Sequence, residues 1–192
     1  MDTFEYITAL VAVVIGLAIA DLAASLHRLL RHRKKIRWDW VSPLAALLIL
    51  AELFNLWWRW RGFEGTTTSE VIPYFVALIL IYLAASITLP DEVPADGLDL
   101  GRYFDENRSY FWFVYACYVA VIITLMSVRG VHQGMTATDL WSRYYFDYPW
   151  ILVAFGMIFV RQRWVSGLVM LVTMGWLIWG LDWWSRSPDA PF

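Results

Sequence analysis

Cysteine is almost missing from this sequence. Cys117 is the only one among 192 residues, so an internal disulfide is excluded. It lies in a long apolar run, which is typical of a buried thiol. Charged residues are also scarce, at 17% of the chain, whereas hydrophobic residues reach 60%. Since an average soluble domain is about 25% charged and about 45–50% apolar, this composition indicates an integral membrane protein.

Common catalytic and cofactor motifs are missing as well. The sequence has no G-x-S-x-G, H-E-x-x-H, P-loop or C-x-x-C pattern. None of its three histidines, His27, His32 and His132, falls inside a long apolar run, which disfavours a haem held between spans. His27 and His32 lie among arginines, a poor setting for a metal. We therefore expect no metal and no cofactor, and nothing nominates an enzyme.

Long apolar runs dominate what remains. Six blocks can be drawn, at residues 4–26, 41–58, 71–89, 110–128, 149–160 and 165–181. Most approach the roughly 20 residues that an α-helix needs to cross about 30 Å of hydrocarbon. We predict an all-α, polytopic membrane protein in which residues 1–192 form one transmembrane domain of about six spans. A 3+3 inverted repeat fits this count. The short fifth block is either a tilted span or a re-entrant segment.

Basic residues set the expected orientation. The loop after the first block contains a dense group, which we call the basic cluster: Arg28, Arg31, Arg33, Lys34, Lys35 and Arg37. Short loops rich in Lys and Arg stay on the cytoplasmic side, so we predict that both termini face outward, which in a bacterium means the periplasm. The first block lacks a basic leader and is expected to be a retained span. The cluster is expected to attract anionic lipid headgroups; we expect no binding to nucleic acid.

A second charged segment is expected on the same side. Residues 90–108 carry six Asp or Glu and two Arg, whereas residues 27–39 carry six Lys or Arg and one Asp. From about Leu98 the acidic segment is expected to become an interfacial helix leading into the fourth block. We predict that the two segments attract each other, and that reversing Asp105 and Glu106 to Lys is partly rescued by Glu at Arg31 and Arg33. The alternative is that the basic cluster engages anionic lipid.

A glutamate stands in the second block. Glu52 is eleven residues from Val41, about 16 Å along a helix and near the bilayer centre. Asn55 and Arg59 follow on the same face. Because a charge at this depth costs roughly 2.5–3.5 kcal/mol, Glu52 is expected to point inward. Either it carries protons or cations along this stripe, or it is hydrogen-bonded to Asn55 or to a tyrosine of another helix and joins helices.

Other polar side chains are candidates for the same interior. They are Asp21, Ser25, Tyr82, Ser86, Tyr115 and Tyr118. Tyr82 with Ser86, and Tyr115 with Tyr118, each fit one polar face, and most of these hydroxyls are expected to bond between helices. Asp21 shares a face with Ser25 and Arg28, so we expect Arg28 to reach back to it. Farther out we expect a charge cluster of Glu5, Arg59, Arg61 and Asp182.

Four segments carry a resemblance. They are GLAIADLAASLHRLLRHR, LAELFNLWWRW, YLAASITLPDE and DLGRYFDENRSYFW. They resemble a group of small bacterial inner-membrane proteins with no assigned activity, which share a small-residue first span, a tryptophan-rich end of the second span and a Leu-Pro-Asp motif. The resemblance covers roughly the first two-thirds of the chain. It implies a bacterial inner membrane and contributes no catalytic residue.

Two functions fit these patterns. The first is a small, homo-oligomeric transporter or channel, in which the Glu52 stripe lines a proton- or cation-linked path. The second is a non-catalytic accessory, lipid-binding or sensor protein. The first is slightly favoured, because a carboxylate at the bilayer centre is costly to keep. A water-filled cavity reaching Glu52 would favour transport, whereas a dry, packed Glu52 would favour the second reading.

Overall fold

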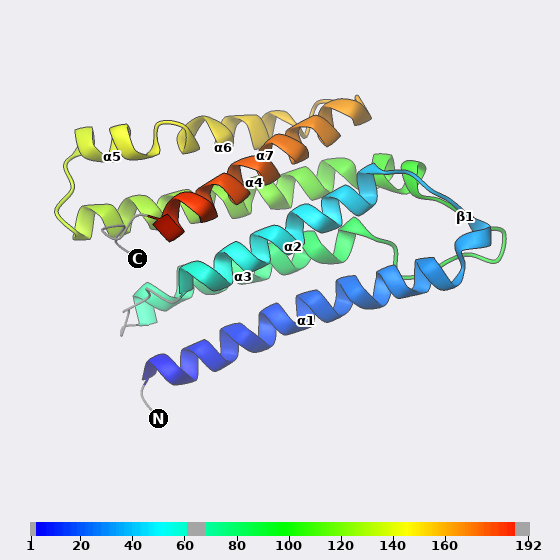
Figure 1. Ribbon diagram of the computed structural model, residues 1–192, viewed down its shortest axis with the longest axis horizontal. Coiled ribbons are helices and arrows are strands. Elements are labelled where there is room, and N and C mark those ends of the chain that lie inside the picture. Colours follow the sequence, from blue (N-terminus) through cyan, green and yellow to red (C-terminus); the bar gives the residue numbers. More distant parts are fainter. Residues whose placement is uncertain (1–2, 61–67, 187–192) are drawn as a thin grey trace.

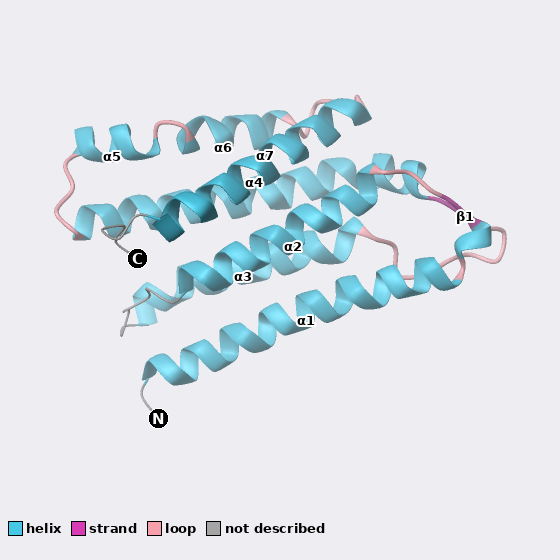
Figure 2. Ribbon diagram, in the orientation of Figure 1, coloured by secondary structure: helices cyan, strands magenta, loops and turns pink. Residues whose placement is uncertain are grey.

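The computed structural model describes residues 3–60 and 68–186, and the described chain is almost entirely helical (Figures 1 and 2). Its helices are α1 (Thr3–Arg31), α2 (Val41–Trp60), α3 (Thr68–Thr88), α4 (Leu100–His132), α5 (Ala137–Tyr144), α6 (Asp147–Gly156) and α7 (Arg163–Arg186). A 3-10 turn, η1 (Arg33–Lys35), and two short strands, β1 (Ile36–Arg37) and β2 (Leu98–Asp99), complete it. The all-α prediction is confirmed.

Within the described residues, five helices are long and apolar enough to cross a membrane. The qualifying stretches are Thr8–Arg31, Val41–Trp58, Val71–Thr88, Leu100–His132 and Arg163–Gly180. The fifth predicted block, 149–160, instead forms the ten-residue helix α6, which is about 15 Å long and too short to span alone. Figure 1 shows α5 and α6 together carrying the chain back along α4, so that α7 begins near the end of the bundle where α4 begins.

The fourth helix begins ten residues before the predicted fourth span. Asp99 caps it, because its side chain accepts a hydrogen bond of 3.1 Å from the backbone N–H of Arg102. The helix then continues without a break to His132. The expected interfacial helix and the span are therefore one continuous element.

The helices pack as a bundle with an apolar interior. α3 packs along α4, α2 along α7, and α1 against α3 and α2. The largest fully buried side chains include Leu29 of α1 and, from α2, α3, α4 and α7, Leu48, Ile49, Leu53, Leu78, Ile81, Phe111, Trp112 and Met170. Large apolar side chains also cover the outside, among them Val13, Leu47, Leu152 and Leu171. A surface this apolar suits contact with lipid and agrees with a membrane location.

One end of the bundle gathers most of the charged contacts, and we call it the basic end. It comprises residues 27–40, 89–108 and 157–163, where α1 ends and α2, α4 and α7 begin. Here β1 and β2 pair in parallel, with Ile36 opposite Leu98 and Arg37 opposite Asp99. Gly97 has φ +104°, and a Cβ there would lie 2.8 Å from the Lys35 carbonyl oxygen. Glycine is therefore required for the two connecting segments to come this close.

The opposite end carries α5. Thr136 and Asp139 form a capping box at its start, with the Thr136 hydroxyl accepting a hydrogen bond from the Asp139 backbone N–H. The bonds from the Thr136 hydroxyl and N–H lower the pKa of the Asp139 carboxyl. Trp141 is 62% exposed, which suits an aromatic side chain at a membrane–water boundary.

Candidate functional site

Glu52 lies in the interior of the bundle, as its position in the sequence predicts. Its side chain is 7% exposed. The Tyr115 hydroxyl donates a hydrogen bond of 2.7 Å to one carboxylate oxygen, and the Tyr118 hydroxyl donates one of 3.3 Å to the other. A spacing of three residues places both tyrosines on one face of α4. Glu52 therefore joins α2 to α4, and the expectation of a tyrosine partner from another helix is confirmed.

Aromatic rings surround this carboxylate on the α4 side. The rings of Phe111 and Tyr115 stack with centroids 6.0 Å apart, and Tyr118 lies 6.1 Å from Tyr115. Trp112 meets Tyr115 edge to face at 5.9 Å. The tyrosine hydroxyls are thus held by packed, largely buried rings. This packing favours a fixed link between helices over a mobile ligand group.

A small cavity lies on another side of Tyr115. It is lined from α4, α6 and α7 by Trp112, Tyr115, Val119, Trp150, Ala154 and Thr173, among others, and has a volume of about 10 Å³. That is close to the minimum for one water molecule. Glu52 is not among its lining residues. The cavity therefore reaches a tyrosine that binds Glu52, but not the carboxylate itself.

The rest of the predicted Glu52 stripe is described only in part. Asn55 is also 7% exposed and lies one turn beyond Glu52 on α2. The side chain of Arg59 lies outside the described residues, as do those of Glu5, Arg61 and Asp182. The expected outer charge cluster therefore stays a prediction.

Two of the predicted hydroxyls, those of Tyr82 and Ser86 on α3, do not bond to Glu52. Ser86 donates its hydroxyl to the Leu83 carbonyl one turn back, at 3.0 Å. Tyr82 is partly buried, and no hydrogen bond links it to Ser86 or Glu52 among the described residues. Tyr115 and Tyr118 therefore form the expected shared polar face, whereas Tyr82 and Ser86 do not.

The polar residues near the end of α1 pair differently from the sequence expectation. Arg28 Nη2 donates to the Ser25 hydroxyl at 2.8 Å and to Asp91 at 3.2 Å. The Ser25 hydroxyl in turn donates to Asp91 at 3.3 Å. The prediction that Arg28 reaches back to Asp21 is wrong, because Asp91 lies closer; Asp21 is seven residues away, about 10 Å along the helix.

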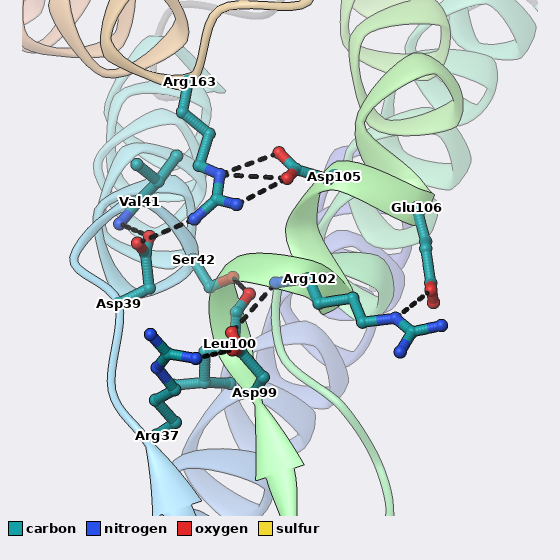
Figure 3. Close-up of polar contacts among 10 residues, drawn as sticks. All are labelled: Arg37, Asp39, Val41, Ser42, Asp99, Leu100, Arg102, Asp105, Glu106 and Arg163. Atoms are coloured by element: carbon teal, nitrogen blue, oxygen red, sulfur yellow. Dashed lines mark hydrogen bonds and ion pairs between the residues drawn. The ribbon is translucent and has the colours of Figure 1, made fainter.

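The predicted attraction between the two charged segments is confirmed. Besides the pair of Arg28 with Asp91, Arg37 pairs with Asp99 at 3.3 Å, and Lys35 donates to the Ala95 carbonyl at 3.2 Å. The Arg102 backbone N–H, and then the positive charge of Arg37, hold the pKa of the Asp99 carboxyl below its ordinary value. Figure 3 shows the bond from Arg102 and the pair with Arg37 converging on Asp99.

Asp105 and Glu106 pair with other residues than the predicted Arg31 and Arg33. Arg163 Nε lies 3.0 Å from both Asp105 oxygens, and its Nη2 lies 2.6 Å from one of them (Figure 3). Glu106 pairs with Arg102 at 2.8 Å within α4. Neither carboxylate pairs with Arg31 or Arg33, whose side chains are exposed.

Arg163 joins three parts of the basic end. Its Nη1 also donates to Asp39 at 3.3 Å, so one guanidinium links α7, α4 and the segment before α2. A Cβ at Gly101 would collide with this Nη1, so the absence of a side chain there leaves room for it. The Ser42 hydroxyl adds a bond of 3.2 Å to the Leu100 carbonyl. Sequence reasoning missed Arg163, because nothing local connects it to carboxylates 58 and 124 residues away.

The basic cluster is therefore divided. Arg28, Lys35 and Arg37 are held by the acidic segment. Arg31, Arg33 and Lys34 are exposed and make no ion pair with any described residue. Three cations of the basic cluster therefore hold the fold together, and the other three are available to a ligand.

No protein-family model matches this chain, and neither characterised proteins nor solved structures yielded a match. The resemblance to small bacterial inner-membrane proteins stays a prediction. The case for a function rests on the geometry of this chain.

Exposed charged side chains are the groups of the described chain that are most open to a ligand. Residues 3–60 and 68–186 contain no group of three or more His, Cys, Asp or Glu side chains that could hold a metal. Both oxygens of Glu52 accept tyrosine hydrogen bonds. In the basic cluster, the exposed cations Arg31, Arg33 and Lys34 are open to a ligand.

Proposed function

We propose that this protein is a non-catalytic, multi-pass inner-membrane protein of the accessory, lipid-binding or sensor class, and that its basic end binds anionic lipid. The observation that carries the proposal is the division of the basic cluster. Arg28 and Arg37 pair with Asp91 and Asp99, whereas Arg31, Arg33 and Lys34 remain exposed and make no ion pair with a described residue.

The orientation follows from the same cations. The basic end faces the cytoplasm by the positive-inside rule, where anionic headgroups attract basic side chains. α1 begins and α7 ends at the opposite end of the bundle (Figure 1), which supports two periplasmic termini. Single cysteines at Arg33 and Thr136 in a Cys117→Ser background test this orientation with an impermeant thiol reagent on intact cells. Labelling at Thr136 alone is expected, and labelling at Arg33 alone would reverse the orientation.

The size of the lipid effect follows from the charge count. Each basic residue near an anionic surface contributes up to about 1 kcal/mol, so three contribute up to about 3 kcal/mol. This corresponds to about a hundredfold in affinity, since about 1.4 kcal/mol is a factor of ten. High salt should weaken the effect, because exposed charges are screened over about 8–10 Å at physiological ionic strength.

The test replaces the three free cations together. The variant Arg31→Gln, Arg33→Gln, Lys34→Gln is expected to retain fewer anionic phospholipids than the parent in native mass spectrometry. A matched control is Arg102→Gln, because Arg102 is 81% exposed but already paired with Glu106. Equal retention of anionic lipid by the parent and the triple variant would contradict the proposal.

The burial of Glu52 supports the accessory, lipid-binding or sensor class over a transporter. Its carboxylate is packed between α2 and α4, and both oxygens are hydrogen-bonded. We infer that Glu52 holds the two helices together. Hydrogen bonds between membrane helices average about 0.6 kcal/mol, with a maximum near 1.7, so Glu52→Leu should cost about 1–3 kcal/mol. Tyr115→Phe should cost more than Tyr118→Phe, since the Tyr115 bond is 2.7 Å and the Tyr118 bond 3.3 Å.

A second candidate, a homo-oligomeric proton- or cation-linked transporter, is favoured by one observation. The cavity of about 10 Å³ is lined by Tyr115, which hydrogen-bonds Glu52, so one water could lie near that carboxylate's partner. Flux measurements in liposomes decide between the candidates. If the parent carries protons or cations and Glu52→Gln does not, the transporter replaces the first proposal. No flux in the parent across a broad ion panel leaves Glu52 as a link between helices.

A further inference from the structure

One basic side chain at the basic end is neither paired nor exposed. Arg108 on α4 is 8% exposed, its Nη1 is fully buried, and no described residue accepts a hydrogen bond from that atom. By contrast, Arg28, Arg37, Arg102 and Arg163 each form an ion pair with a carboxylate. Arg108 is therefore a buried cation whose charge no described side chain balances.

The neighbours of Arg108 on its own face of α4 are apolar. It lies one turn from Phe104 and one turn from Trp112 on the same face of α4, and these rings are 3% and 0% exposed. It is eight residues from the start of the helix at Leu100, about 12 Å along the axis. Side chains on a helix lean toward its N-terminus, and long basic side chains extend toward water. The guanidinium is therefore directed toward the basic end.

The two acidic residues nearest to Arg108 in the sequence are already paired. Asp105, three residues earlier, accepts three hydrogen bonds from Arg163. Glu106 is bound to Arg102. A second cation at Asp105 would compete with a closely fitted guanidinium and carboxylate pair. Arg108 therefore needs a negative charge from outside the described chain.

We propose that Arg108 binds a phosphate group that enters the bundle at its basic end, carried either by an anionic phospholipid or by free phosphate. An unbalanced charge inside a membrane protein is strongly unfavourable, which is why such residues pair or mark binding sites. A guanidinium offers parallel hydrogen bonds that fit phosphate oxygens. Basic sites between membrane helices on the cytoplasmic side hold phosphate headgroups in this way.

This site differs from the surface binding proposed for Arg31, Arg33 and Lys34. Those cations are exposed and act through charge near the membrane surface, whereas Arg108 acts through direct hydrogen bonds to one group inside the bundle. The inference depends on the proposed function only for lipid as the source of the phosphate. Free phosphate would satisfy Arg108 even if the exposed cations bound no lipid.

The experiment measures thermal unfolding of the full chain after lipid removal, in a neutral detergent. Phosphatidylglycerol, phosphatidylcholine and inorganic phosphate are added separately. We expect the parent to melt at a higher temperature with phosphatidylglycerol, and Arg108→Met to lose this rise. Without added phosphate, Arg108→Met should melt at or above the parent temperature, because an unbalanced buried charge has been removed. Arg102→Met is the matched control and should keep the rise, because Arg102 is highly exposed and already paired with Glu106.

The outcomes distinguish a lipid phosphate from free phosphate, and a phosphate site from a purely structural role of Arg108. A rise with phosphatidylglycerol alone identifies a lipid headgroup, and an equal rise with inorganic phosphate identifies a free anion; both support the proposal. A lower melting temperature of Arg108→Met without phosphate, with the rise unchanged, would show that Arg108 only packs and would overturn it. If Arg108→Met does not fold, Arg108→Gln is used with the same criteria. Loss of the rise in the Arg31, Arg33 and Lys34 variant, with the rise kept in Arg108→Met, would overturn this site and leave the proposed function standing.

Discussion

Arg163 is the most direct test of how the basic end is built. Its guanidinium makes three contacts of 2.6–3.0 Å with Asp105 and one of 3.3 Å with Asp39. Hydrogen bonds to charged groups contribute about 1.5–3 kcal/mol when well formed, and exposed ion pairs about 0.2–1 kcal/mol. Because Arg163 is 42% exposed, we place its contribution between these ranges. Arg163→Met should therefore cost about 1–2 kcal/mol.

The assay is thermal unfolding of the purified chain in neutral detergent. For a protein of this length about 1 kcal/mol corresponds to roughly 2–4 °C, so the midpoint should fall by about 2–8 °C. Arg163→Lys should restore only part of the loss, because an ammonium cannot form the same paired contacts. Arg102→Met is the matched control. Its bond to Glu106 is a highly exposed pair within one helix, worth about 0.3–0.5 kcal/mol.

Charge reversal identifies the partner. Asp105→Lys should lower the midpoint, and adding Arg163→Glu should restore part of it. Adding Arg31→Glu should restore nothing, because Arg31 is exposed and pairs with neither Asp105 nor any other described carboxylate. Rescue by Arg31→Glu, or an equal loss from Arg102→Met and Arg163→Met, would refute the reasoning about the basic end.

Two further predictions concern the same end. Gly167→Ala should lower stability by about 1–3 kcal/mol, because its Cβ would collide with the ring of Trp40; a Trp40→Ala background should remove that loss in the same unfolding assay. Asp99 has a lowered pKa in the folded chain, caused first by the Arg102 N–H and then by Arg37. Its contribution to stability is therefore complete above its unfolded pKa, near pH 4, and is lost as the pH falls below that value. Asp99→Asn should flatten the dependence of the unfolding midpoint on pH in that acidic range; an unchanged profile would contradict the assignment.

The sequence by itself determined the helical class of the protein and the burial of Glu52. Apolar run length and scarcity of charge are properties of the linear chain, and they predict membrane-spanning helices with no knowledge of packing. The inward direction of Glu52 follows from the cost of exposing a carboxylate to lipid. The attraction between residues 27–39 and 90–108 follows from opposite charge alone. Each of these predictions needs only a local pattern and one physical rule.

Tertiary structure decided which groups meet. Several tyrosines and carboxylates lay at suitable positions, and spacing could not select Tyr115 for Glu52, 63 residues away, or Arg163 for Asp105, 58 residues away. The partner of Arg28 was mistaken for the same reason, since a neighbour on the same helix is visible in the sequence and Asp91 on a distant loop is not. Contacts between distant segments depend on how the helices pack.

Packing also decided the length of the helix at the fifth block and the burial of Arg108, neither of which the sequence settled. The fifth block became the ten-residue α6, because α5 shares the return path along α4 (Figure 1). Arg108 looked like an ordinary basic residue near the membrane boundary until the fold buried it and left its Nη1 without a hydrogen-bond partner among the described residues. Burial is a property of all the helices together, and a single helix cannot reveal whether its charged side chain faces water, protein or a ligand.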